Sequence, residues 1–550
     1  MYLYIRIGFV QADSMSVRKR ALGALPVLHH YLRQLRWPQL LTPLIGHGAY
    51  IEALELLVKS VLLKPNALYR IGAWAQDYDP AYRAAQYISD DVLARALDRL
   101  FEADRASLLT SLVVRAIQVF QIDTSQIHND STSVKFCGAY ERQNPKGLQL
   151  HRGFSKDHRP DLKQLVYSLS ISADGAVPIH YKAYPGNQTD DPTHWETWQF
   201  LCRLVGKEDF LYVADSKLCV TQTLQQIDGR GGRFVTILPR QRCEAKDFAE
   251  QAAEAKIQWE PLWKRRALRK GKRQECFELA RGTYPLKEGF SLYWYRSSEK
   301  RLHDFQMRQE RIKKALQRLG RLNQRRGRAP KTEPAISRAA ERMLAKYQVG
   351  AWIKFQIKTV TRYQNRQSTR GKAGAQTKVW KERIETPVFS AQCDSVALAR
   401  AATMDGVFPL VTNTKLSPLE VLRKYKYQPC LEKRHCLFKS VLEVSPVFLK
   451  KNTRIEALMF IYFTAELIAA LLERTVRKNM STHGLDALPI LPEGRESKTP
   501  SYRQIIETFE SCEKVELYEN NQLCRLFGPS LTDLQQLVLR LLEVNAGVYS

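Results

Sequence analysis

The sequence predicts an α/β protein in which a mixed sheet with helices is interrupted by a large basic insertion domain and is flanked by helical regions. Three observations predict this fold class. Between about residues 116 and 239, strand-like and helix-like stretches follow one another in the order β-β-β-α-β-α-β. A strongly basic stretch comes next, after which strand and helix patterns resume. Apolar residues at helical spacing dominate both ends of the 550-residue chain.

The N-terminal region, residues 1–115, is predicted to be helical because its apolar residues recur at intervals of three and four. Leu93, Ala96, Leu97 and Leu100 illustrate this spacing. A helical region at one end of a basic protein suits the binding of DNA ends, and it equally suits a scaffold. No helix-turn-helix signature decides between the two roles, so both stay open.

Residues 116–239 supply the first part of the predicted sheet. Three β-rich runs, QIHNDSTSVKFCG, KQLVYSLSISADG and VPIHYKAYPGN, each end at or near a glycine. This pattern predicts three successive antiparallel strands. A helix, the short apolar strand FLYVAD, a second helix and the strand RFVTILPR follow in turn.

Residues 240–395 form the predicted insertion domain, which carries most of the charge. Of the formal net charge of +29, residues 241–390 contribute +22, with 37 Lys and Arg against 15 Asp and Glu. An excess this concentrated suits a polyanion such as nucleic acid better than it suits a solubilising surface. Arg325, Arg326 and Arg328 are our candidates for phosphate contacts in this domain.

Residues 396–480 are expected to complete the sheet domain. They contain the strand-like run DGVFPLVTNT, then a helix that opens after Pro429 and carries Glu432, then an apolar helix. Residues 481–550 are expected to form a linker and a helical C-terminal region.

The most apolar segment, residues 457–472, is interrupted by Glu466 and is shorter than the roughly 20 residues that a membrane span needs. We therefore expect a buried helix without membrane association, with Thr453 and Glu456 as a capping box at its start. The ten cysteines are scattered and form no CxxC pair, which favours reduced thiols and a cytoplasmic protein.

Three carboxylates stand at places from which they can converge on one edge of the sheet. Asp130 lies within the first long strand, Asp215 ends the strand FLYVAD, and Glu432 begins a helix. Acids of this kind can hold two divalent ions, which prefer oxygen ligands and promote in-line displacement at phosphorus. The alternatives are a solvated helix face for Glu432 and Asp123 in place of Asp130.

The stretch YKYQPCLEKRHCLFKS resembles the C-terminal signature of bacterial insertion-sequence DDE transposases, in which Tyr, Arg, Glu and Lys follow at fixed spacing. This chain has Tyr425, Gln428, Glu432 and Lys439 at those positions, so Gln428 departs from the family's Arg. The resemblance extends to residues of about 120–240 and 400–480.

The resemblance implies a ribonuclease-H-like core with an insertion between the second Asp and the Glu. It further implies a DNA transposase that cleaves and joins the inverted-repeat ends of its element. Asp130, Asp215 and Glu432 would hold two Mg²⁺ ions, for which Mn²⁺ can substitute. The expected partners are double-stranded DNA, as repeat ends and as target, and a second copy of the chain in a homodimer on DNA.

Further basic residues are candidates for DNA contacts beside the sheet. Lys156 and Arg159 precede the second strand and Lys163 begins it; these residues can bind phosphates or can lie on a solvated strand edge. In the signature itself, Tyr425, Gln428 and Lys439 are the DNA-binding candidates. Two other functions remain open at this point: a stand-alone ribonuclease-H-like nuclease and a non-catalytic DNA-binding protein derived from a transposase.

Overall fold

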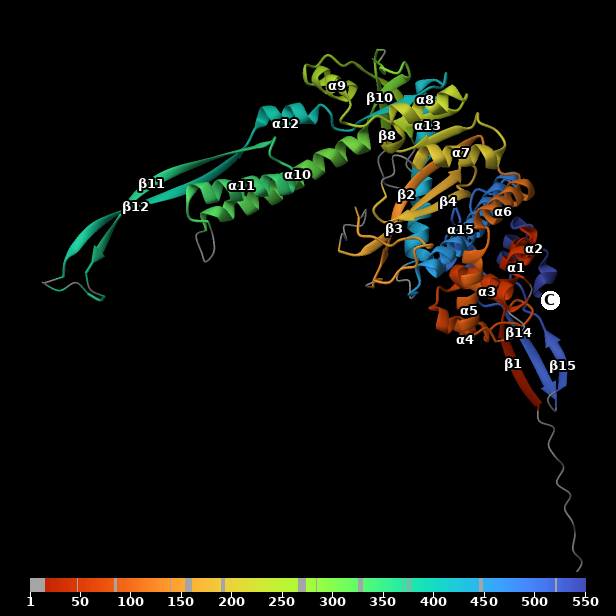
Figure 1. Ribbon diagram of the computed structural model, residues 1–550. Helices are drawn as coiled ribbons and strands as arrows, with labels where there is room; N and C mark the ends of the chain where they lie inside the picture. Colours follow the sequence, from red (N-terminus) through yellow and green to blue (C-terminus); the bar gives the residue numbers. More distant parts are fainter. Residues whose placement is uncertain are drawn as a thin grey trace, which may run out of the picture. The chain divides into compact units, whose positions relative to one another are not determined.

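The computed structural model divides the chain into two compact units. Unit 1 comprises residues 1–236 and 423–550, and unit 2 comprises residues 237–422. The residues that the structure describes are 15–46, 48–83, 87–138, 140–153, 161–188, 193–265, 274–282, 284–324, 330–368, 370–372, 374, 377–444, 449–519 and 522–550. Figure 1 labels their helices and strands in chain order.

The sheet of unit 1 is mixed, as the sequence predicts. Its strands are β2 (Gln126–Phe136), β3 (Lys163–Ser172), β4 (Pro178–Pro185), β5 (Leu211–Ala214) and β6 (Arg233–Ile237). They are ordered β4-β3-β2-β5-β6; β2, β3 and β4 are antiparallel neighbours, whereas β5 runs parallel to β2 and to β6. This is the arrangement expected of a ribonuclease-H-like core, so the predicted fold class is confirmed.

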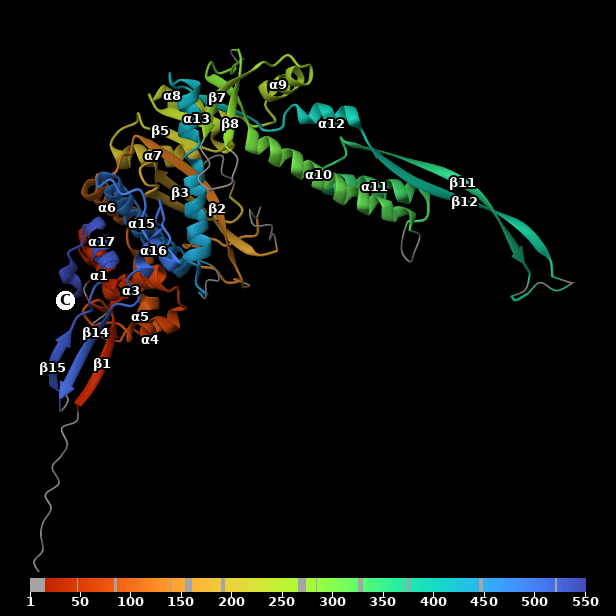
Figure 2. The same ribbon diagram turned by 180° about the vertical axis from the view of Figure 1, so that it is seen from behind.

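Helices connect these strands and return to them from the C-terminal side. The connecting helices are α7 (Thr193–Val205), the short η1 (Ser216–Leu218) and α8 (Thr221–Gly229). The returning helices are α13 (Pro418–Tyr425), α14 (Gln428–Cys436), the π-helical turn η3 (Leu437–Val441) and α15 (Asn452–Thr482). Helix α14 packs on β2 and β3, and α15 packs on β4. Figure 2 shows α15 from behind.

Helix α15 is the apolar helix that the sequence predicts, and it forms the centre of unit 1. It is the one described helix long and apolar enough to cross a membrane, and 94% of its most apolar window is buried inside the protein. Glu466 lies fully buried within it, and this burial raises the pKa of the carboxyl to about 8. The acid is accommodated because it stays neutral.

The expected capping box at the start of α15 is not formed. The N-cap residue is Lys451, which makes no side-chain capping bond. Glu456 instead pairs with Arg105 at 2.6 Å and accepts the backbone N–H of Leu148 at 2.8 Å. These two partners from elsewhere in the fold stabilise the charge of the Glu456 carboxylate more than the backbone N–H groups at the helix start would.

The N-terminal helices confirm the expected helical region. They are α1 (Leu25–Gln34), α2 (Trp37–Ile45), α3 (Ala49–Leu63), α4 (Leu68–Ala75), α5 (Asp90–Glu102) and α6 (Arg105–Phe120). In α5 the residues at helical spacing, Leu93, Ala96, Leu97 and Leu100, are all buried. Ser89 caps this helix by accepting the N–H of Val92.

Both ends of the chain also contain strands, which differs from the helical regions that we expected. Strand β1 (Met15–Ala21) pairs with β14 (Glu513–Glu519), which in turn pairs with β15 (Gln522–Phe527). Two C-terminal helices, α16 (Tyr502–Glu507) and α17 (Asp533–Leu541), flank this hairpin in the sequence. These strands carry many polar residues, so their pairing, not an apolar pattern, defines them.

Unit 2 contains an antiparallel sheet and a helical hairpin. Its sheet strands are β7 (Trp259–Arg265), β8 (Glu275–Ala280), β9 (Tyr284–Pro285), β10 (Ser291–Ser297) and β13 (Val407–Thr412), and α9 (Cys243–Ala253) precedes them. The order is β13-β10-β8-β7, with β9 beside β10. The strand at 407–412, β13, pairs with β10 in antiparallel register.

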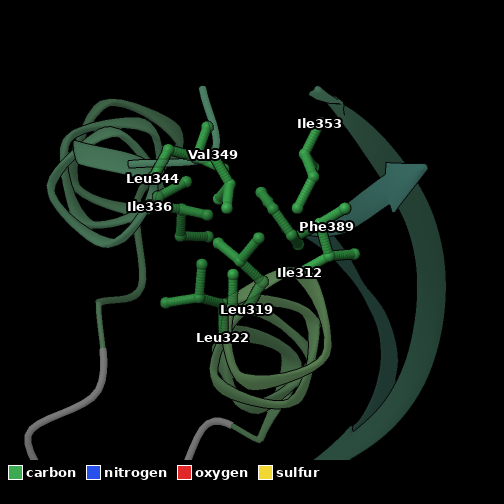
Figure 3. Packing of buried hydrophobic residues seen from close by; sticks show 10 residues of the cluster. Ile312, Leu319, Leu322, Ile336, Leu344, Val349, Ile353 and Phe389 are labelled. Carbon is green, nitrogen blue, oxygen red and sulfur yellow. The ribbon is translucent and has the colours of Figure 1, made fainter. Parts of the chain in front are cut away.

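The remainder of unit 2 is built on helices and a long two-stranded ribbon. Its elements are α10 (Ser298–Gly320), η2 (Arg321–Asn323), α11 (Glu333–Tyr347), β11 (Ile353–Gln367), β12 (Val379–Cys393) and α12 (Ser395–Ala402). Ile312, Ala315 and Leu319 form one buried stripe of α10, because residues three and four apart share a helix face. They pack with α11 and with Ile353 and Phe389 of the ribbon (Figure 3).

Candidate active site

Asp130 lies in the middle of β2, where most of the strand is buried. The preceding residue, Asn129, is buried and donates hydrogen bonds to Ser168 Oγ at 3.1 Å and Ser170 Oγ at 2.9 Å on β3. Since successive side chains of a strand point to opposite faces, Asp130 emerges on the other face, where it is partly exposed. One of its carboxylate oxygens accepts the N–H of Ser131 at 2.7 Å.

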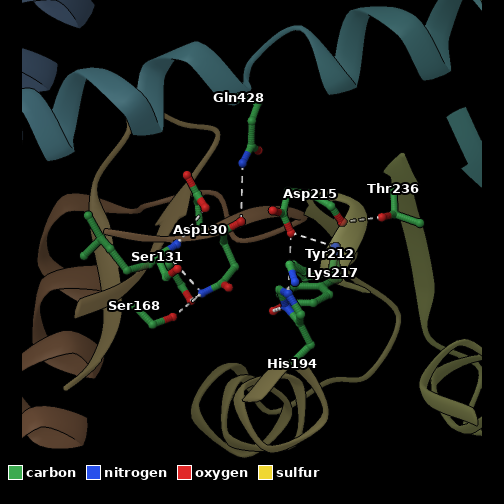
Figure 4. Close-up of polar contacts among 12 residues, drawn as sticks. Asp130, Ser131, Ser168, His194, Tyr212, Asp215, Lys217, Thr236 and Gln428 are labelled. Atoms are coloured by element: carbon green, nitrogen blue, oxygen red, sulfur yellow. Dashed lines mark hydrogen bonds and ion pairs between the residues drawn. The ribbon is translucent and has the colours of Figure 1, made fainter. Parts of the chain in front are cut away.

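Asp215 comes beside Asp130 through the register of two parallel strands. Asn129 of β2 is aligned with Ala214, the last residue of β5. The residues that follow, Asp130 and Asp215, therefore leave the paired region next to each other. Figure 4 shows the two carboxylates on neighbouring strands.

Several groups fix the position of Asp215. Its carboxylate caps η1 by accepting the N–H of Lys217 at 3.0 Å, and its backbone carbonyl accepts the hydroxyl of Thr236 on β6 at 2.6 Å. The imidazole of buried His194 lies 3.8 Å from the carboxylate and bonds to the Tyr212 hydroxyl at 3.1 Å through its other nitrogen. The side chain of Asp215 remains 39% exposed and thus accessible.

Glu432 is placed by the helix that carries it. One turn earlier on α14, Gln428 reaches to β2, where its amide donates to the carbonyl of Asn129 at 3.3 Å (Figure 4). Its amide oxygen bonds to Nδ1 of His128 at 2.7 Å. Residues four apart lie on nearly the same face of a helix, so Glu432 follows Gln428 on this face of α14, and its side chain is exposed.

A hydrogen-bonded chain of side chains holds α13 and α14 to β2. Lys424 donates to the side-chain oxygen of Gln126 at 3.2 Å, and the Gln126 amide bonds to Nε2 of His128 at 2.7 Å. His128 then bonds to Gln428 through Nδ1. Burial lowers the pKa of His128 to about 4, so the imidazole is neutral and can accept at one nitrogen while donating at the other.

The three carboxylates all act electrostatically on Tyr425, the last residue of α13. Burial raises the pKa of this hydroxyl most, and the charges of Asp215, Glu432 and Asp130 each raise it further. A charge acts in this way only on a nearby group. The three acids predicted from the sequence therefore all lie near enough to Tyr425 to act on it electrostatically.

The three carboxylates match a divalent metal ion in the chemistry of their donor atoms. All three side chains are carboxylates, which supply the hard oxygen ligands that Mg²⁺ and Mn²⁺ prefer. Within the described part of the chain, no group of three or more His, Cys, Asp or Glu side chains lies close enough together to hold a metal ion.

The alternative acid, Asp123, has a local structural role. It accepts the N–H and the hydroxyl of Ser125, both at 2.8 Å, in the loop that precedes β2. This is an Asx turn, in which aspartate commonly occurs. Its position favours Asp130 as the functional acid.

The predicted DNA-binding residues are placed differently from one another. Gln428 is buried and bonded to β2, so we assign it a positioning role. Lys163 donates to the carbonyl of Tyr140 at 2.8 Å, and Lys439 is half-buried in η3. The remaining candidates, Lys156, Arg159, Arg325, Arg326 and Arg328, lie outside the described residues.

The supporting residues were missed in the sequence. His128 and Gln126 lie two and four residues before Asp130 at alternate strand positions, and their partners on α13 and α14 lie about 300 residues away. Among these supporting residues, Gln428 alone stood out in the sequence, because it has a neutral amide where the family signature has a cationic arginine. His194 gave no signal because its contact with Asp215 depends on the packing of α7 against the sheet.

No protein-family model and no curated protein matches the chain. Among solved structures, it is similar to a cryo-EM structure of a piggyBac transposase synaptic complex with hairpin DNA. The identity is 10% and the TM-score 0.37, over 88% of this chain and 78% of that chain. At these values the likeness assigns neither a family nor an activity to this protein.

Proposed function

We propose that the protein is a DDE-type DNA transposase that cuts and joins DNA at the inverted-repeat ends of its own insertion sequence. The observation that supports this proposal is the register that brings Asp130 and Asp215 onto neighbouring parallel strands, with Glu432 on the helix α14 that packs on β2. The charge of +22 on residues 241–390 supports double-stranded DNA as the partner. We further propose that two copies act together on two DNA ends in the bacterial cytoplasm.

Each residue of the site has a distinct part in this proposal. Asp130, Asp215 and Glu432 would hold Mg²⁺, or Mn²⁺ in its place, which when bound supplies Lewis acidity at the scissile phosphate. Tyr425, whose raised pKa keeps its hydroxyl protonated, is suited to donating a hydrogen bond to a phosphate oxygen that enters the site. His194 and Gln428 keep Asp215 and Glu432 in position.

The test is cleavage of DNA that carries the sequences flanking the reading frame, in Mg²⁺ and in Mn²⁺. Asp130→Asn, Asp215→Asn and Glu432→Gln should each slow cleavage by more than about 100-fold, because ligation of the metal is worth several kcal/mol in the transition state. DNA binding should stay within a few-fold. The matched control is Asp123→Asn, which keeps the turn and should cut normally.

The outcomes separate the proposal from its rivals. Near-wild-type cutting by one variant removes that residue from the site, and cutting by all three overturns the proposal. A wild-type protein that binds the ends without cutting them in either metal is a non-catalytic DNA-binding protein. One that cuts any duplex without joining ends is a stand-alone nuclease.

A further inference from the structure

The ribbon formed by β11 and β12 has two faces of different character. Residues paired across the two strands share a face, so Ile353 with Cys393 and Ile357 with Phe389 belong to one face. This face is covered near the base of the ribbon, where Ile353 and Phe389 are buried against α10 and α11. Figures 1 and 2 both show the strands continuing beyond the ends of these helices.

The opposite face is open along the ribbon and carries a regular pattern. On β11, basic residues recur at every fourth position: Lys354, Lys358, Arg362 and Arg366. On β12, three of their cross-strand partners are apolar: Lys358 is paired with Val388, Arg362 with Ile384 and Arg366 with Trp380. The open face therefore presents a row of cations beside apolar side chains that alternate with Thr386 and Glu382, and the Glu382 carboxylate pairs with Arg366 at 2.6 Å.

This pattern is exposed to solvent. Lys358, Arg362 and Arg366 are exposed on β11, while Val388 is 38% and Trp380 50% exposed on β12. Exposed apolar side chains arranged in a row mark an interaction surface. Over residues 353–393 the chain has nine Lys and Arg against two Glu, so the complementary partner is anionic.

We propose that the open face of the β11–β12 ribbon lies in the major groove of duplex DNA, with the basic row on the phosphates and the apolar row toward the base edges. The inference rests on the proposed function for its choice of DNA. A two-stranded ribbon fits the major groove, about 12 Å wide, whereas the minor groove is about 6 Å wide. Thymine methyl groups supply apolar contacts there.

A second copy of the chain fits this ribbon less well. Adding a strand requires an uninterrupted row of backbone N–H and C=O groups along a strand edge. Pro387 lacks an N–H within β12, and lysines and arginines along the ribbon discourage such pairing between identical chains. The basic row, in contrast, would repel itself in a symmetric contact.

The experiment compares two double variants that remove the same charge from opposite faces of one ribbon. Lys358→Ala with Arg362→Ala changes the open face, and Lys381→Ala with Arg383→Ala changes the other. The four residues are exposed, so both proteins should fold with unchanged melting temperatures. Binding to end-sequence duplex is measured between 50 and 300 mM salt, together with methylation protection of guanine N7, a major-groove atom.

For the open-face variant, the slope of log K against log salt concentration should become less steep by about 1.8 units. Its affinity for DNA should fall by about 30-fold at 0.15 M salt, as expected for two lost phosphate contacts. N7 protection should disappear with it, and Trp380→Ala should also lose protection while keeping the salt slope. Equal losses from both double variants, or unchanged protection in the open-face variant, overturn the proposal. Cleavage by wild type tests the function separately, because the ribbon contributes none of the three carboxylates.

Discussion

Gln428→Met should loosen α14 and so displace Glu432 from the site. Gln428 is 7% exposed and makes two hydrogen bonds, with His128 Nδ1 at 2.7 Å and with the carbonyl of Asn129 at 3.3 Å. Methionine has a similar volume but neither polar group. The substitution leaves the N–H of fully buried His128 without its partner, which costs about 2 kcal/mol.

The assay is hydrogen exchange followed by mass spectrometry, because it reports local opening in a chain with two units. A loss of about 2 kcal/mol corresponds to about 30-fold faster exchange in peptides that cover residues 428–436. Peptides from α10 in unit 2 should not change. DNA cleavage should fall while DNA binding stays within a few-fold, since the perturbed element carries Glu432.

The double variant Gln428→Met with His128→Leu separates an unsatisfied polar group from a general packing defect. Replacing both partners by apolar side chains should be nearly neutral, so exchange should return to within a few-fold of wild type. Gln126 keeps the carbonyl of Lys424 as a partner at 3.1 Å in this variant. Unchanged exchange in the single variant, or equally fast exchange in the double variant, would refute the reasoning.

Two other predictions concern pH and the predicted phosphate contacts. Burial holds the pKa of His128 at about 4 and that of His180 at about 3, below 6.5 in the unfolded chain, so unit 1 should lose stability as pH falls from 6.5 to 4. For His128 the loss in the free energy of unfolding is about 3 kcal/mol, so the melting temperature of His128→Leu should fall less than that of wild type between pH 6.5 and 4. Glu466 acts in the opposite direction in both proteins, because a carboxyl with a raised pKa stabilises the folded protein as pH falls. Tyr425→Phe and Lys439→Ala should weaken binding of cleaved ends without changing metal affinity, measured by end binding and metal titration; unchanged end affinity in both variants would exclude the phosphate role.

The elements that carry the three candidate carboxylates could be predicted because each element depends on local sequence. Asp130 lies inside a recognisable strand, Asp215 follows a short apolar strand, and Glu432 belongs to a spaced signature. The buried helix α15 was likewise visible as an apolar run. These features need only the period of a strand or helix and the position at which it ends.

The supporting structure could not be predicted because its contacts join distant residues. The pairing of β1 with β14 brings together residues about 500 positions apart, and neither strand has a strong apolar alternation. Glu456 fits the local pattern of a capping box, yet its partners Arg105 and Leu148 come from elsewhere in the fold. A local motif such as a capping box does not form where tertiary partners bind the charged side chain more strongly than the helix end does.

The relation between Glu432 and Lys439 illustrates the same limit within one signature. Seven residues of an ideal α-helix make nearly two turns and would return Lys439 to the face of Glu432. In the structure α14 ends at Cys436 and continues as the π-helical turn η3, whose wider turn changes this angular relation. Phe438 at this turn stacks on Tyr167 of β3 at 4.4 Å, so the sheet itself supports the wider geometry. Helix geometry therefore sets the position of Glu432, whereas packing against the sheet sets the position of Lys439.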